Sequence, residues 1–143
     1  MEENTMKKFA RIMAVALVAV LALAALVACG PASDPEKAAA ALKENGYAVA
    51  SVIGSDSVAG KVAQATLDAI AIAAGLEAGD ITATVTATNG NEGISITYFK
   101  SASAAKTFWD KNKDSIEKKD GWVTKISGSM IYTGTEQAVK DAR

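Results

Sequence analysis

The stretch ITATVTATNGNEGISITY, residues 81–98, decides the fold of this 143-residue chain. Four apolar residues, from Ile81 to Ala87, alternate with four threonines. This period-two pattern is typical of a strand with one buried face and one polar face. Residues 89–93 are rich in Asn and Gly, as in a hairpin turn, and the alternation then resumes as far as Tyr98. The stretch therefore predicts a β-hairpin in an antiparallel sheet.

Three elements are predicted before this hairpin. Asp34-Pro35 begins a helix that Asn45-Gly46 ends, and the short apolar run 47–53 predicts a strand at the centre of the sheet. Residues 58–74 predict a second helix, whose apolar side chains recur at helical spacing and are expected to face inward. This expected inner face comprises Val58, Val62, Ala65, Ala69, Ile72 and Ala73, and the expected outer face carries Lys61, Gln64 and Asp68.

Four elements are predicted after the hairpin. Ser101 or Ser103 caps a helix. Strands over 122–127 and 130–133 flank the turn Gly128-Ser129, and the capping-box pattern of residues 133–136 begins a short last helix. The helix after the hairpin has an expected inner stripe of Ala104, Ala105, Phe108, Trp109 and Ile116.

The order of the six central elements, strand-helix-strand-strand-helix-strand, resembles the ferredoxin-like split βαβ arrangement. The resemblance implies an α+β fold, in which an antiparallel sheet carries helices on one face. An N-terminal helix and a C-terminal strand-helix extension complete the expected domain, and the threonine-rich face is expected to lie outward. A likeness at the level of the fold implies no function.

The N-terminus has the three parts of a secretory signal. Basic residues (Lys7, Lys8 and Arg11) precede an uninterrupted apolar run over 12–27. The run ends in Leu26-Val27-Ala28-Cys29, which resembles the lipobox of bacterial lipoproteins. The resemblance implies cleavage between Ala28 and Cys29, a diacylglycerol on the Cys29 thiol, and often a fatty acid such as palmitate on the new amine.

This interpretation divides the chain into a signal peptide (1–28), a short tether (29–33) and a single α+β domain (34–143). The domain would be held by its lipid at the outer face of the cytoplasmic membrane, or at the outer membrane of a two-membrane bacterium. Two alternatives remain open: free secretion after an ordinary signal, and an uncleaved anchor. The apolar run is short for an anchor, because spanning a bilayer takes about 20 apolar residues.

Composition restricts the chemistry of the domain. The chain has no histidine, one cysteine and a net charge of −1. The charge argues against nucleic-acid binding, and the missing histidine excludes the usual general base and the commonest zinc ligand. The loop carboxylates Asp56, Glu77, Asp80 and Glu92 lack the spacing of a calcium loop. We therefore expect no cofactor, no metal and no enzymatic activity. A histidine-independent hydrolase would need a carboxylate–Lys or Ser–Lys pair in a cleft.

Two weak candidate surfaces remain. Thr82, Thr84 and Thr86 predict a polar platform, which Phe99 would extend with an apolar spot suited to self-association. A solvated sheet face explains the same pattern without any function. Trp109, Trp122 and Tyr132 could line a ligand pocket, although such aromatics more often belong to the core. The leading hypothesis is a lipid-anchored envelope protein that binds a protein partner or forms a homodimer. The alternative is a ligand-binding accessory lipoprotein of a transporter or sensor.

Overall fold

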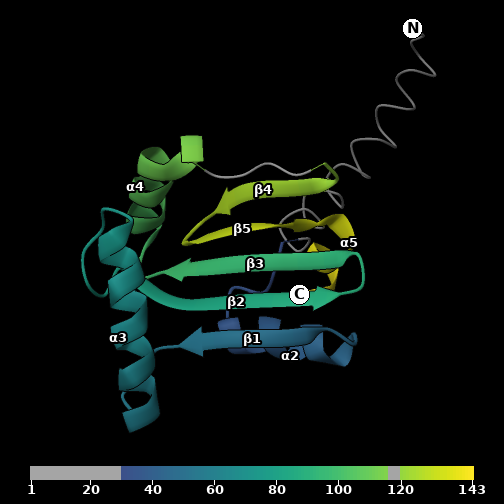
Figure 1. Cartoon of the computed structure of the whole chain (residues 1–143), viewed down its shortest axis with the longest axis horizontal. Helices are drawn as coiled ribbons and strands as arrows, with labels where there is room; N and C mark the ends of the chain where they lie inside the picture. Colours follow the sequence, from purple (N-terminus) through teal and green to yellow (C-terminus); the bar gives the residue numbers. More distant parts are fainter. Residues whose placement is uncertain (1–29, 116–119) are drawn as a thin grey trace, which may run out of the picture.

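A computed structural model describes residues 30–115 and 120–143, which form a five-stranded antiparallel sheet with helices packed against it (Figure 1). The expected α+β class is confirmed, and the elements begin and end close to the residues predicted from the sequence. In chain order the elements are α2 Pro35–Glu44, β1 Ala48–Ile53, α3 Val58–Ala73, β2 Ile81–Asn89, β3 Glu92–Phe99, α4 Ala102–Asn112, the 3-10 turn η1 Lys113–Ser115, β4 Trp122–Ser127, β5 Met130–Thr135 and α5 Glu136–Asp141.

The strands lie in the order β1-β2-β3-β5-β4, and every neighbouring pair is antiparallel. The prediction of a central strand over residues 47–53 is wrong, because β1 is an edge strand. In a βαβ crossover the helix joins parallel strands, whereas α3 joins two antiparallel neighbours, β1 and β2. The likeness to the ferredoxin-like arrangement therefore lies in the class and the sequential order of elements, while the strand order is this chain's own.

One side of the sheet, here called the covered face, lies against α2 and α5 (Figure 1). The apolar residues of the β2–β3 hairpin point to this side, as the alternation predicts. They form a core with Leu42 of α2 and Val139 of α5. The sheet residues of this core are Ala83, Val85, Ala87, Ile94, Ile96, Tyr98, Met130 and Tyr132.

Helices α3 and α4 lie at one end of the strands rather than on the covered face (Figure 1). They form a second apolar cluster with Val52 and Ile131, two residues on the opposite side of the sheet. The helices are thus divided between one face and one end of the sheet. This division leaves most of the threonine-bearing side without a helix among the described residues.

Side-chain caps begin the helices. The Asp34 carboxylate accepts a hydrogen bond from the Glu36 N–H at 2.9 Å, and Ser101 caps α4 in the same manner. The last helix is capped by Thr135, whose hydroxyl accepts from the Ala138 N–H at 3.3 Å. Thr133, the first residue of the predicted capping box, instead belongs to β5.

Helix α3 is rotated relative to the sequence prediction. Its buried residues are Gly60, Leu67 and Ala71, and Leu67 is fully buried. The predicted inner face is exposed: Val58 is 83%, Val62 66% and Ile72 61% accessible. The predicted inner face is therefore wrong, and of the predicted outer face Gln64 and Asp68 are half-buried while Lys61 is exposed.

Some predicted features lie outside the described residues: the signal peptide, Ala28 and Cys29 of the lipobox, and Ile116. Within the part of the chain that the structure describes, no helix has both the length and the apolar character needed to cross a bilayer.

Candidate functional site

The threonine-bearing side of the sheet, here called the threonine face, is an open platform. The strand registers align its side chains in three rows that run across the sheet. In two of these rows, the residue on the central strand β3 is a serine or a threonine. The Thr124 hydroxyl donates to that of Thr133 at 2.8 Å within the middle row. From β1 to β4, the rows are Val52-Thr84-Thr97-Ile131-Ile126, Ala50-Thr86-Ser95-Thr133-Thr124 and Ala48-Thr88-Gly93-Thr135-Trp122. In the last row, the Gly93 N–H donates to the Thr135 hydroxyl at 3.3 Å.

Trp122 bounds the end of the platform that lies far from α3 and α4. Its indole lies over Gly93, where an added Cβ would stand 2.9 Å from the ring. Only glycine leaves room for the ring at this position, so the half-buried indole covers the sheet backbone. Of the predicted platform residues on this face, Thr86 is exposed and Thr84 is half-buried. Thr82 is half-buried at a β-bulge and donates to the Tyr98 carbonyl at 3.4 Å.

The structure separates the predicted aromatic residues. Trp122 and Tyr132 lie on opposite sides of the sheet, and Trp109 packs against the α3–α4 cluster. Of the three, only Tyr132 lines any of the three described cavities. The predicted exposed spot at Phe99 is wrong, because its ring is buried beside Phe108 with centroids 5.3 Å apart. No shared aromatic pocket forms among these residues.

The largest exposed apolar feature lies on α3. Four of the five large hydrophobic side chains exposed among the described residues belong to this helix. Most of them fall on one face, here called the α3 stripe, which consists of Val58, Val62, Ala65, Ala69, Ile72 and Ala73. Sequence reasoning found this set through its helical spacing but assigned it to the core. An exposed apolar surface of this kind is typical of an interaction site.

Among the residues that the structure describes, no strand pairs with the outer side of the neighbouring strand β1, which therefore has a free edge. Its sequence, AVASVI, contains no charge and no proline. Natural edge strands usually carry such residues to prevent pairing with another chain, and the other edge strand, β4, carries Lys125. The N–H of Gly54 donates to the Thr82 carbonyl at 3.0 Å. Because bonded positions alternate in an antiparallel pair, the backbone groups of Val49, Ser51 and Ile53 point outward from the edge.

The first turns of α3 extend beyond β1, past the edge of the sheet (Figure 1). Gln64 marks where the helix crosses the end of β1, since it lies beside Gly54 and its side-chain amide donates to the Ile81 carbonyl at 3.0 Å. The six residues from Gln64 back to Val58 add about 9 Å of helix. This length is about two strand spacings, so the first turns of the helix, which carry the start of the stripe, lie next to the free edge.

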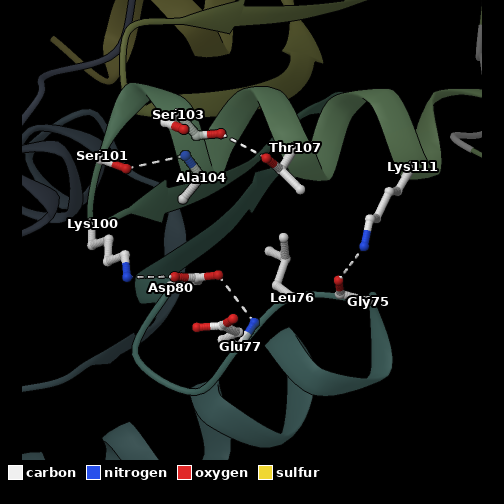
Figure 2. A pocket seen from close by; sticks show the side chains of 10 residues that line it. All are labelled: Gly75, Leu76, Glu77, Asp80, Lys100, Ser101, Ser103, Ala104, Thr107 and Lys111. Carbon is white, nitrogen blue, oxygen red and sulfur yellow. Dashed lines mark hydrogen bonds and ion pairs between the residues drawn. The ribbon is translucent and has the colours of Figure 1, made fainter.

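A polar cleft of about 310 Å³ lies between the α3–β2 loop and α4 (Figure 2). Its ionic groups hold the loop to the helix. The Asp80 carboxylate pairs with Lys100 at 2.9 Å and accepts from the Glu77 N–H at 3.0 Å. The Lys111 ammonium donates to the Gly75 carbonyl at 2.7 Å. These contacts fix the loop in place and so stabilise the fold.

The electrostatics of this cleft oppose proton transfer at neutral pH. The Glu77 N–H, followed by Lys100, lowers the pKa of Asp80, while the hydrogen bond to Asp80 raises the pKa of Lys100. Each partner is held more firmly in its charged form, whereas a general acid or base works best with a pKa near the operating pH. The Ser101 hydroxyl accepts from the Ala104 N–H as a helix cap. The cleft therefore contains a carboxylate–Lys pair that is poorly suited to catalysis.

Residues 30–33, assigned by sequence to a tether, pack on the covered face. The Ala32 N–H donates to the Ala142 carbonyl at 2.8 Å, and the Tyr98 hydroxyl donates to the Ala32 carbonyl at 2.8 Å. Burial is the main cause that raises the pKa of Tyr98. Pro31 is buried. The chain that precedes Gly30 therefore joins the domain at a fixed position.

The comparisons with known proteins give no indication of function, so any functional proposal has to come from the geometry of the structure. No family model matches the chain, and neither curated protein sequences nor solved structures give a match. Within residues 30–115 and 120–143, no group of three or more His, Cys, Asp or Glu side chains is arranged to hold a metal ion.

Proposed function

We propose that this chain is a lipid-anchored envelope protein whose domain binds a protein partner through β1 and the α3 stripe. The carrying observation is that an uncharged free strand edge lies beside an exposed aliphatic helix face. Strand addition would satisfy the outward backbone groups of Val49, Ser51 and Ile53. Full burial of Val58, Val62 and Ile72 would add about 1.5–3 kcal/mol for each side chain.

The proposed role is non-enzymatic. The Asp80–Lys100 pair is held in its charged state, and the Ser101 hydroxyl caps α4. The threonine face supports the same role less strongly, because none of the three described cavities is lined by its rows of hydroxyl side chains. The ligand-binding alternative lacks a favouring observation, since the three candidate aromatics do not converge.

The anchor part of the proposal is supported by the lipobox and by the position of Gly30. Cys29 is one peptide bond from Gly30, about 3.8 Å between Cα atoms, and residues 30–33 are bonded to the domain. Expression of the full chain in a bacterium, followed by detergent phase partitioning, tests it. The Cys29→Ala variant should leave the detergent phase or accumulate unprocessed. Unchanged partitioning of this variant contradicts the lipid assignment.

The interaction part is tested by site-specific photocrosslinking in cells. A photoreactive amino acid at position 62 should give a discrete adduct, which a second substitution, Ile72→Lys, should reduce. The matched control carries the same group at position 107, because Thr107 is exposed on α4. Equal labelling from positions 62 and 107, or none from position 62, would refute binding at the α3 stripe.

A further inference from the structure

We propose that the partner at β1 is a second copy of this chain, paired antiparallel through β1 about a two-fold axis. This inference rests on the proposed interaction function and names its partner. The resulting sheet would have ten strands.

The free edge is self-complementary in hydrogen bonding. Three residues of β1 direct their backbone groups outward, and Ser51 is the middle one. If Ser51 lies on the two-fold axis, it faces the partner's Ser51, and Val49 faces the partner's Ile53. This register pairs every outward N–H and C=O of the strand. A one-residue shift would present groups already bonded to β2.

The edges of two copies are also compatible in charge. Directly opposed like charges destabilise a strand pair. The sequence Ala48–Ile53 has no ionisable side chain, so two copies meet without repulsion along the strand. An edge of this kind left bare would be prone to indiscriminate pairing, which a specific dimer prevents.

The overhang of α3 fits the same arrangement. In an antiparallel pair, the Ile53 end of one strand lies beside the start of the partner's strand. The overhanging first turns of α3 would therefore extend over the start of the partner's strand, on the side of its small residues Ala48 and Ala50. The two α3 helices would stand at opposite ends of the strands in the ten-stranded sheet. The face of α3 that packs on the sheet, which carries Gly60 and Leu67, would point toward the partner, and the α3 stripe would remain on the outer side.

The position of the preceding chain supports this symmetry. A two-fold axis that relates antiparallel strands of one continuous sheet is perpendicular to that sheet, so both covered faces point the same way. Gly30 lies on the covered face, beside Tyr132 and Val139. Both copies would thus present their Cys29 attachment points on one side. The cavities beside Gly30 are lined by one carboxylate, Glu136, and by three cationic residues, so their excess of positive charge suits a surface facing phospholipid headgroups: Lys125, Lys140 and Arg143.

The experiment is disulfide trapping in the full chain, extracted from membranes in mild detergent. Bonded antiparallel partners have Cα atoms about 5.5 Å apart, which is within disulfide range. Oxidation of the Ser51→Cys variant should convert most of the chain to a covalent dimer. The matched control is Lys125→Cys on the opposite edge, and the parent chain reports any background from Cys29. If Ser51→Cys gives no more dimer than Lys125→Cys, the proposal is overturned.

A second variant distinguishes a stable dimer from disulfides that form when two monomers collide by chance. Ser51→Lys places two ammonium groups together on the axis, and because residue 51 is exposed the monomer should still fold. Its dissociation constant, measured by analytical ultracentrifugation in detergent, should rise at least about tenfold. An unchanged constant refutes the register. Should the chain prove monomeric while position 62 still crosslinks to another protein, the dimer is refuted and the proposed function stands.

Discussion

The orientation of helix α3 makes a sharp prediction, because the interaction site exists only if the α3 stripe faces outward. Leu67 is 0% and Val62 66% accessible. Leu67→Ala should remove a core side chain and lower the free energy of unfolding by about 2–5 kcal/mol. Val62→Ala should change it by less than about 0.5 kcal/mol, as expected for a surface position.

Thermal denaturation of the two variants measures this difference. For a domain of this size, 1 kcal/mol corresponds to a shift of about 4 °C in Tm. Leu67→Ala should therefore melt about 8–20 °C below the parent, and Val62→Ala within about 2 °C of it. Melts at low protein concentration separate folding from association, because binding raises apparent stability by mass action. If Val62→Ala is as destabilising as Leu67→Ala, the stripe is buried and the proposed site does not exist.

Three further predictions concern the rest of the domain. Tyr98→Phe removes the hydroxyl that donates to the Ala32 carbonyl and should lower the free energy of unfolding by about 1 kcal/mol. The Ala32 amide should then exchange its hydrogen faster, and an unchanged exchange rate would contradict the prediction. A backbone N–H and then an ammonium lower the pKa of Asp80 below its ordinary 3.8. The ionised Asp80 therefore stabilises the fold above that value, and this contribution is lost as the pH falls through the lowered pKa. The Asp80→Asn variant should have a lower Tm than the parent chain at neutral pH, and its Tm should fall less than that of the parent on acidification. Gly93→Ala should displace the Trp122 indole and shift its fluorescence, whereas an unshifted spectrum would mean that the ring lies elsewhere.

Local sequence patterns predicted the elements but not their neighbours. The alternation from Ile81 to Tyr98 defines the hairpin and its buried side, since period two is a property of the strand itself. The caps at Asp34 and Ser101 are equally local. The free edge was missed because an apolar run such as AVASVI also suits a central strand, and the order of strands depends on contacts distant in sequence.

The orientation of α3 depends on such distant contacts. Helical periodicity identified the α3 stripe, but the stripe was assumed to face inward because it is apolar. The structure instead buries Leu67 and Ala71. Beside them, Asp68 accepts hydrogen bonds from the Gly79 N–H at 2.7 Å and from the Gln64 amide at 2.8 Å. These side chains satisfy backbone and loop groups that no pattern within the helix reveals.

The hydrogen bond from Ala32 to Ala142 has a consequence for timing. Residue 32 is synthesised long before residue 142, so the donor exists well before its acceptor. Until Ala142 has been made and placed, the segment around Ala32 cannot dock in its final position. Under the proposed lipid anchor, processing at Cys29 would therefore be easiest before the domain has folded.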